Sequence, residues 1–169
     1  MADAFSLIHI IKAKESDIPT INFIAHEVWP VTYRDVIPQE QIVYMLDWMY
    51  SPESLRKQML DEGCTFFILL ENNQPKGFAS YSNLSHRIFK LHKLYVSTTS
   101  QRSGCGRKLL DTVINEVSLE GGGELQLQVN KKNPSCGFYK KLGFVVLEEA
   151  VFDIGNGFVM DDFIMTKKV

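Results

Sequence analysis

The chain has 169 residues, of which 45% are hydrophobic and 22% are charged, with a formal net charge of −2 at pH 7. This length favours a single domain over residues 1–169 with its own buried core. A charge close to neutral argues against nucleic acid as a partner. The apolar runs are far shorter than the ~20 residues of a membrane-spanning helix, and the N-terminus does not resemble a signal peptide. We therefore expect a cytoplasmic protein.

The cysteines indicate neither a disulfide framework nor a metal site. Cys64, Cys105 and Cys136 are an odd number of widely spaced residues without a Cys-x-x-Cys pair. The histidines likewise show no spacing that is typical of metal ligands. We therefore expect no bound metal.

The first half of the chain predicts one strand, three helices and then two more strands. A strand is expected over 5–13. Ser16-Asp17-Ile18-Pro19 supplies an N-cap and a proline in the first turn of a helix, which Trp29-Pro30 is expected to end near residue 28. Two more helices, 38–48 and 51–61, precede strands at 64–71 and 76–82, which the turn Asn72-Asn73 joins into a hairpin.

The second half alternates strands and helices. The expected elements are a strand over 90–97, a helix over 107–120, a strand over 124–129, a short helix over 134–141 and strands over 144–153 and 158–167. Asn156-Gly157 is a favourable turn between the last two strands. The order predicts a mixed α/β domain.

A strand-like segment, 91–96, runs directly into a loop with two glycines and then into an amphipathic helix. Gly104 and Gly106 allow a ligand to approach the backbone closely. The unpaired N–H groups of the first helical turn and the positive end of the helix dipole attract an anion. Residues 94–108 therefore predict a phosphate or pyrophosphate site. The alternative is an ordinary strand-to-helix turn in which the glycines only permit tight packing.

The loop does not fit the two common nucleotide-binding motifs. A P-loop ends in Gly-Lys-Ser/Thr, but Gly106 is followed by Arg-Lys-Leu. A Rossmann fingerprint requires a third glycine where this chain has Leu109. The pattern over 101–106, Gln-x-x-Gly-x-Gly, resembles instead the acetyl-CoA motif of the GCN5-related N-acetyltransferase (GNAT) family.

A second segment resembles the other signature of this family, in which an asparagine after the fifth strand precedes a Phe-Tyr-x-Lys-x-Gly-Phe helix end. Here residues 124–129 alternate as a half-buried strand does. Asn130 and Asn133 then precede Phe-Tyr-Lys-Lys-Leu-Gly-Phe at 138–144. Between Asn133 and Phe138 the chain is one residue shorter than the common pattern. Whether Asn130 or Asn133 faces the cofactor is therefore open.

The resemblance covers about 88–145 and implies the GNAT fold, an α/β (α+β) domain with a mixed, mostly antiparallel seven-stranded sheet and four or five helices. It implies acetyl-CoA as co-substrate, with the pantetheine arm between the fourth and fifth strands. Arg102 and Arg107 can add charge-assisted hydrogen bonds to the diphosphate. The residues implied in cofactor binding are Leu94, Tyr95, Val96, Gln101, Arg102, Ser103, Gly104, Cys105, Gly106, Arg107, Asn130, Asn133 and Tyr139.

Tyr139 is predicted to be the general acid. Direct attack of an amine on the thioester releases a CoA thiolate, and a phenol with an ordinary pKa of ~10 can protonate that sulfur. The position of Tyr139 within the helix-end signature favours this role. The alternative is a core residue whose hydroxyl reaches the surface.

The attacking amine must be neutral, so the reaction needs a base or a water path. Many relatives carry a glutamate on the fourth strand, but residues 90–93 read Lys-Leu-His-Lys. His92 is the predicted base because imidazole titrates near neutrality; a solvated strand side chain is the alternative. Glu27, Tyr33 and Asp35 are further candidates from the helices beside the acceptor.

The predicted acceptor is a small, cationic, polyamine-like amine. Residues 15–62 contain nine acidic and three basic residues, and an acidic groove attracts cations. Acidic residues at helix N-termini are an alternative explanation of this charge. The chain also resembles the bacterial spermidine/spermine N-acetyltransferase branch, at Trp-Pro-Val-Thr-Tyr (29–33), Tyr-Met-Leu (44–46) and Met-Asp-Asp-Phe-Ile-Met (160–165).

Two other functions remain open from the sequence. One is acetylation of a protein N-terminus or lysine, and the other is a non-catalytic acyl-CoA-binding regulatory module. The apolar final strands could pair between protomers, so a homodimer is one expectation. Neither a nucleic acid nor a membrane is expected as a partner.

Overall fold

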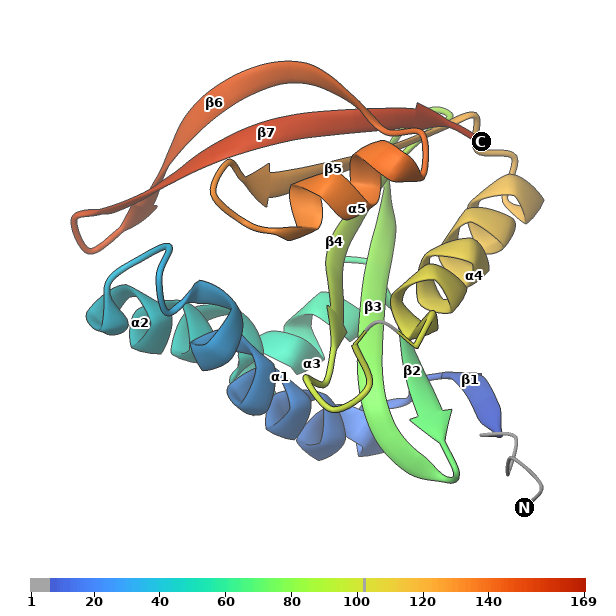
Figure 1. Ribbon diagram of the computed structural model, residues 1–169. Helices are drawn as coiled ribbons and strands as arrows, with labels where there is room; N and C mark the ends of the chain where they lie inside the picture. Colours follow the sequence, from blue (N-terminus) through green and yellow to red (C-terminus); the bar gives the residue numbers. More distant parts are fainter. Residues whose placement is uncertain (1–6, 102) are drawn as a thin grey trace.

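Seven strands of the computed structural model form one sheet in the order β1-β2-β3-β4-β5-β7-β6, and helices cover both faces (Figure 1). The structure describes residues 7–101 and 103–169. The strands are β1 (Ile8–Lys12), β2 (Thr65–Glu71), β3 (Gln74–Ser85), β4 (Ile88–Val96), β5 (Glu124–Asn130), β6 (Val145–Gly155) and β7 (Phe158–Lys168). The helices are the short 3₁₀ helix η1 (Glu15–Asp17), then α1 (Ile18–Tyr33), α2 (Gln39–Tyr50), α3 (Pro52–Leu60), α4 (Cys105–Leu119) and α5 (Ser135–Lys141).

This architecture confirms the expected mixed, seven-stranded sheet. The described residues form five α-helices, within the expected four or five. Residues 5 and 6 of the first predicted strand lie outside the described residues. The strand β3 extends beyond the predicted 76–82 at both ends. Both predicted hairpin turns form, with positive φ values of 50° and 63° at Asn72 and Asn73 and of 54° and 76° at Asn156 and Gly157.

Every pairing in the sheet is antiparallel except that of β4 with β5, which run parallel. The β4–β5 ladder joins residues 88–91 to residues 124–127 and ends at the pair Leu91–Leu127. Beyond this pair the two strands point in different directions, as Figure 1 shows. The sheet is thus split into a β1–β4 half and a β5–β7 half that meet in a V.

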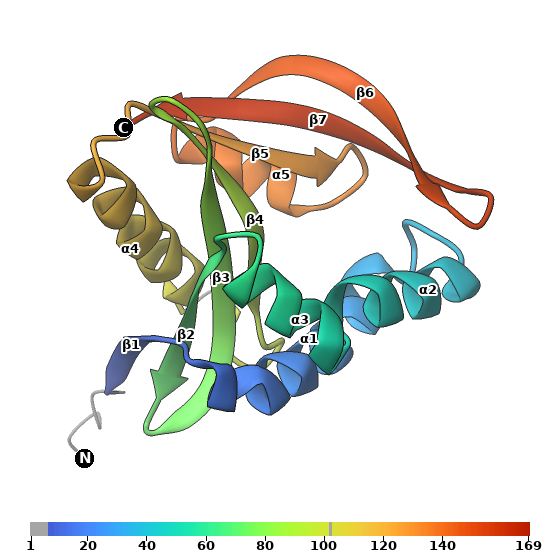
Figure 2. The ribbon, with the colours of Figure 1, turned by 180° about the vertical axis from the view of Figure 1, so that it is seen from behind.

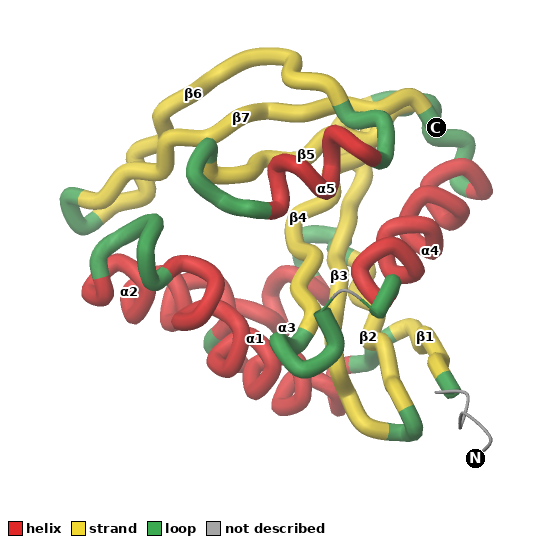
Figure 3. The backbone as a smooth tube through the Cα atoms, viewed as in Figure 1, coloured by secondary structure: helices red, strands yellow, loops and turns green. Residues whose placement is uncertain are grey.

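The sheet has an apolar core on each face. The core under α1–α3 includes Phe66, Ile68 and Phe78, which alternate along β2 and β3 with the residues of the second core. The second core packs Leu69 and Leu127 against α4 and α5. Figures 2 and 3 show α1–α3 gathered on one side of the β1–β4 half, away from α4. The V is therefore bordered by α1–α3 on one side of the sheet and by α4 and α5 on the other.

Helix α1 continues to Tyr33, so the predicted end at Trp29-Pro30 is wrong. Proline inside a helix removes one backbone hydrogen bond and costs about 3 kcal/mol. Trp29 and Tyr33, 2% and 5% exposed, lie one turn apart with ring centroids 4.3 Å apart. Burying two aromatic side chains stabilises the last turn by about as much as the proline costs. Tertiary packing therefore keeps the helix intact.

No helix within 7–101 or 103–169 is both long and apolar enough to cross a membrane.

Candidate active site

A small cavity of about 40 Å³ lies where β4 and β5 separate. Its walls come from β4, β5, the last residue of α1 and the start and middle of α5. The lining residues are Tyr33, Leu91, His92, Lys93, Leu94, Tyr95, Leu127, Gln128, Val129, Asn133, Ser135 and Tyr139. The structure thus brings together five residues that the sequence predicted for the site, His92, Leu94, Tyr95, Asn133 and Tyr139, and with them the further candidate base Tyr33.

Tyr139 lines this cavity from α5 and is only 6% exposed. Its ring makes edge contacts with Phe138 and Phe144, with centroids 5.2 and 5.6 Å apart. Burial, and then the neighbouring Tyr33, raises the pKa of the Tyr139 hydroxyl. The phenol therefore keeps its proton at neutral pH and can donate it to a nearby atom that gains negative charge.

A hydrogen-bonded group of polar side chains crosses the mouth of the V. The Tyr33 hydroxyl lies 3.1 Å from the Tyr95 hydroxyl, and Asn133 Nδ2 donates to Tyr33 at 3.4 Å. Burial raises the pKa values of Tyr33 and Tyr95. These contacts connect the end of α1, the end of β4 and the loop before α5, which are distant in the sequence.

The two candidate asparagines have different environments. Asn133 lines the cavity, and its Oδ1 accepts hydrogen bonds from the backbone N–H and the hydroxyl of Ser135, at 2.9 and 2.6 Å. Asn130 Oδ1 accepts from the N–H of Lys132 at 2.9 Å. Asn133 is therefore the asparagine that faces the space between β4 and β5.

Helix α4 begins at the predicted glycine loop. Gly104 is its N-cap with φ +83°, a left-handed conformation that costs other residues roughly 1 kcal/mol or more. The first amide to bond within this turn is Lys108 N–H, which donates to Gly104 O at 3.0 Å. The N–H groups of residues 105–107 precede it and point out of the helix end. With the helix dipole, they can bind an anion.

The other predicted residues of the loop have varied surroundings. Gln101 Nε2 donates to the Val96 carbonyl at 3.1 Å, which ties the loop to the end of β4. Cys105 is buried and accepts from Ser103 Oγ at 2.9 Å. Arg107 is exposed and lies 3.7 Å from Asp111. Arg102, also predicted to bind the diphosphate, lies outside the described residues.

A β-bulge in β4 places His92. On β3, Ser80 pairs with Lys93 and Tyr81 pairs with Leu91, so His92 has no partner on β3. Its Nε2 lies 2.7 Å from Ser82 Oγ. Although part of the side chain is exposed, partial burial and the charges of Lys93 and Lys90 lower the His92 pKa to about 4. The ring is thus neutral at pH 7 and a weaker base than free imidazole; its catalytic role stays a prediction.

The bulge also borders a larger cleft of about 510 Å³ between β4 and helices α2 and α3. Both the small cavity and this cleft include His92 and Lys93 in their walls, so the two spaces adjoin the same bulge. The other lining residues are Trp48, Met49, Ser51, Glu53, Ser54, Lys57, Gln58, Glu62 and Cys64. A cleft of this volume can hold a small molecule beside the bulge.

Lys93 was missed by the sequence reasoning. It is 9% exposed, and its Nζ donates to Gln58 Oε1 at 2.7 Å and lies 5.4 Å from the centre of the Tyr50 ring. Burial lowers its pKa to about 8, although Cys64 and Glu62 act in the opposite direction. A lysine beside apolar residues on a predicted buried strand is the signal that could have indicated it.

The remaining expectations concern the further candidate bases and metal binding. Of the predicted further bases, Tyr33 lines the cavity, whereas Glu27 accepts a hydrogen bond from Ser97 Oγ at 2.6 Å and borders a different pocket. Asp35 is exposed, 4.0 Å from Arg34. In the described part of the chain, no group of three or more His, Cys, Asp or Glu side chains could hold a metal ion.

Comparison with known proteins decides the family. The model of the acetyltransferase (GNAT) domain family matches residues 34–162, which include the bulge, the glycine loop and the α5 signature. The chain belongs to the GNAT acetyltransferase family. The expected enzyme class, an N-acetyltransferase, is thereby confirmed.

Individual similar proteins support the assignment of this chain to the GNAT family. It is 28% identical over 148 residues to the probable N-acetyltransferase Rv2775 of Mycobacterium tuberculosis, covering 82% of this chain and 80% of that protein. The structure of the PaiA N-acetyltransferase of Thermoplasma acidophilum, solved with coenzyme A, is similar with a TM-score of 0.81, 26% identity and coverage of 96% and 99%. The ribosomal-protein-S18-alanine N-acetyltransferase of Escherichia coli shares the fold, with a TM-score of 0.74, 21% identity and coverage of 96% and 94%.

Proposed function

We propose that this GNAT enzyme transfers acetyl from acetyl-CoA directly to a primary amine of a small molecule. The observation that carries the proposal is the cavity between the diverging strands β4 and β5, with Tyr139 in its wall and the bulge between it and the larger cleft. One side of the sheet can then hold the thioester donor, and the other can admit the amine.

The predicted cofactor residues fit acetyl-CoA. The first-turn amides of α4 suit a pyrophosphate, because they combine unpaired donors with the positive end of a 15-residue helix. Backbone groups of Leu94 and Tyr95 lie along the edge of β4 that β5 leaves unpaired. The similar PaiA enzyme was solved with coenzyme A, which supports the same ligand here.

Bound acetyl-CoA would supply the thioester, and the protein would place the amine and move protons. The amine attacks the thioester carbon, the carbon–sulfur bond breaks, and Tyr139 gives its proton to the departing sulfur. The raised pKa of Tyr139 suits a group that must be protonated before transfer. Asn133 and Tyr33 hold the mouth of the cavity in place.

The acceptor expected from the sequence, a polyamine-like cation, forms part of the proposal. Glu53 and Glu62 in the wall of the cleft favour a cation, but Lys57 and Lys93 lie in the same wall. Some other acidic side chains of 15–62 are paired away from the cleft, as in the ion pair of Glu15 with Arg56 at 3.0 Å. The local charge that attracts a polyamine is thus smaller than the sequence count suggests.

The second candidate is acetylation of a protein N-terminus or lysine. The E. coli enzyme with this fold acts on an alanine of ribosomal protein S18, but its likeness to this chain is one of fold. A cleft of about 510 Å³ is of the size typical for small ligands. This favours the small amine over a peptide. A cytoplasmic location and a homodimer remain predictions from the sequence.

The test is acetyl-CoA-dependent thiol release with a panel of spermidine, spermine, diamines, amino acids and short peptides. Turnover of small amines alone would support the proposal. Turnover confined to peptides would favour the second candidate. Coenzyme A binding without turnover of any amine would favour the regulatory module.

A further inference from the structure

Lys93 brings a positive charge into the wall of the cleft between β4 and helices α2 and α3. The residue lines both this cleft and the small cavity between β4 and β5, although only 9% of it is exposed. Its Nζ lies 5.4 Å from the centre of the Tyr50 ring and 5.9 Å from that of Phe66, two residues of the core under α1–α3. The ammonium group is therefore on the acceptor side of the sheet, and the acetyl transfer described above does not use it.

Gln58 of α3 fixes the position of this ammonium group. It is 8% exposed, and its Oε1 accepts a hydrogen bond from Lys93 Nζ at 2.7 Å. Its Nε2 donates to the Met49 carbonyl at 2.8 Å and to Ser54 Oγ at 3.0 Å, so the amide cannot rotate without losing these bonds. All four residues line the cleft. The ammonium group is thus part of a connected polar wall.

Lys93 has no counterion within the chain as described. Over residues 7–101 and 103–169 its Nζ donates to Gln58 Oε1, and no carboxylate forms an ion pair with it. An ammonium group carries three N–H donors, so two remain for an acceptor from outside the chain. Lysine is almost never buried without a partner, because an unpaired buried charge is costly. An anionic group of a bound molecule would supply that partner.

The other charged side chains of the cleft do not neutralise Lys93. Glu62 acts on Lys93 electrostatically, but it pairs with Lys57 Nζ at 3.6 Å, so the charges of Glu62 and Lys57 largely cancel. Glu53 is exposed and forms no ion pair among the described residues. The cleft thus presents one buried cation and one exposed carboxylate. This pattern is complementary to a molecule that carries both a carboxylate and an ammonium group.

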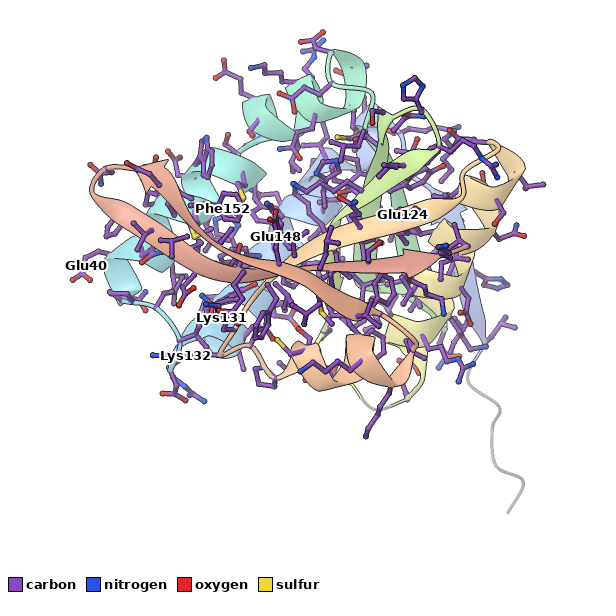
Figure 4. All side chains as sticks on the ribbon, turned by 90° about the horizontal axis from the view of Figure 1, so that it is seen from above. Glu40, Glu124, Lys131, Lys132, Glu148 and Phe152 are labelled. Carbon is purple, nitrogen blue, oxygen red and sulfur yellow. The ribbon has the colours of Figure 1, made fainter. Side chains whose placement is uncertain are left out.

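The acidic residue at the start of α2 does not change this balance. In Figure 4, Glu40 lies at the edge of the molecule, whereas the cleft adjoins the opposite end of α2, at Trp48 and Met49. The separation of Glu40 from Trp48 along the helix axis is about 12 Å. At this distance an exposed charge is largely screened at physiological salt.

We propose that Lys93 binds a carboxylate of the acceptor, so that the amine acetylated by this enzyme is an amino acid. This inference rests on the proposed function and narrows its small primary amine to one class. The cationic, polyamine-like acceptor becomes a diamino acid, which keeps a net positive charge, and Glu53 is available to its remaining ammonium group.

The position of Lys93 on β4 relates this carboxylate site to the reaction. The cleft and the small cavity adjoin the same bulge, and Lys93 is in the wall of both. An amino acid that is held there by its carboxylate keeps its amine beside the bulge. Burial lowers the pKa of Lys93 to about 8, so the group is still mostly protonated at pH 7 and available to a carboxylate. A bound carboxylate would offset the burial and stabilise the ammonium form.

The experiment measures kcat/KM at pH 7.5 for free lysine and for 1,5-diaminopentane, which differ only by the carboxylate. The ratio of the two values is independent of the fraction of active enzyme. We expect wild type to prefer lysine, and the ratio to fall by roughly 10-fold or more in Lys93→Met, because a hydrogen bond to a charged group is lost. Lys93→Arg keeps the positive charge and should keep part of the preference.

Lys57→Met is the matched control, because it removes an exposed lysine of the same cleft. It should keep the wild-type ratio. An equal fall in both variants would overturn the inference, since it would indicate a general effect of charge. Lysine methyl ester tests wild type without any substitution, and we expect it to lose the preference because its carboxylate is neutralised. Turnover of the ester equal to that of lysine would also overturn the carboxylate site.

The same assays separate this inference from the proposed function. A wild-type enzyme that is active on amines but prefers 1,5-diaminopentane, with a ratio that Lys93→Met changes by less than a factor of ~3, would overturn the carboxylate site alone. Failure of wild type on every amine would overturn the proposed function. Calorimetry of lysine binding to the coenzyme A complex would then decide. Binding that is lost in Lys93→Met would support the carboxylate site, and the absence of binding to wild type would overturn it.

Discussion

Tyr33 and Tyr95 join their hydroxyl groups at 3.1 Å across the mouth of the V, although 62 residues separate them in the chain. This contact fixes the end of α1 against β4, and Asn133 adds the loop before α5 to it. The last turn of α1, which follows Pro30, thus forms part of the cavity wall.

Replacing Tyr33 with Phe should lower the free energy of unfolding by about 1–2 kcal/mol, because two hydrogen bonds are lost and their buried partners remain. It should also raise KM for the amine. Urea unfolding and steady-state kinetics measure these effects. Tyr44→Phe is the control, since its hydroxyl bonds the Ile154 carbonyl at 2.7 Å and does not line the cavity. Equal kinetic effects in both variants would exclude a specific role for Tyr33.

Replacing Tyr139 with Phe tests the general acid. The ring contacts with Phe138 and Phe144 are kept, so the fold and the coenzyme A affinity should change little. We expect kcat to fall by roughly 10²-fold, the usual contribution of a positioned acid. Thiol release and calorimetric coenzyme A binding separate the two effects. An unchanged kcat would mean that the thiolate leaves without help from this phenol.

Replacing Gly104 with Ala tests the anion site at α4. No atom lies within 4 Å of an added Cβ, so the cost, roughly 1–2 kcal/mol, comes from the left-handed φ of +83° alone. Coenzyme A affinity should fall as the first-turn amides shift. Gly121→Ala is the control, because Gly121 has a similar left-handed φ of +81° and no atom within 4 Å of an added Cβ, but follows the opposite end of α4. Thermal unfolding with and without coenzyme A compares the coenzyme A affinities of the two variants. Equal affinities would contradict the role of this loop in anion binding.

Replacing Lys93 with Met tests the buried ammonium. Its pKa is lowered from 10.5 to about 8, so between these values the unfolded chain binds more protons than the folded one. The Lys93 contribution to the free energy of unfolding therefore increases with pH over this window, by up to about 3 kcal/mol. The Lys93→Met variant should therefore have a higher free energy of unfolding than wild type at pH 7, and this difference should be lost by pH 10.5.

Urea unfolding of both proteins at several pH values measures this difference. Lys57→Met is the control, because Lys57 is largely exposed and pairs with Glu62 at 3.6 Å. A pH-independent difference between wild type and Lys93→Met would show that the ammonium is not desolvated.

Local patterns were sufficient for most elements. The two hairpin turns depend on Asn72-Asn73 and Asn156-Gly157. These residues adopt the positive φ values that tight turns between strands require. Helix α4 follows from its apolar stripe and its glycine N-cap. The end of α1 could not be predicted this way, because the packing of Trp29 and Tyr33 outweighs the local effect of Pro30.

The candidate site likewise has features that local sequence indicates and features that only tertiary contacts determine. The glycine loop and the Phe-Tyr helix end are contiguous motifs, so the sequence could indicate both and the family to which they belong. The bulge that leaves His92 unpaired and the burial of Lys93 beside Gln58 depend on strands and helices from distant parts of the chain. Sequence by itself determined the order of elements and their turns, and it predicted the anion site, because these depend on neighbours within a few residues. Only the tertiary structure decided which charged groups are desolvated beside the V, because desolvation and pairing depend on contacts between segments that are far apart in the sequence.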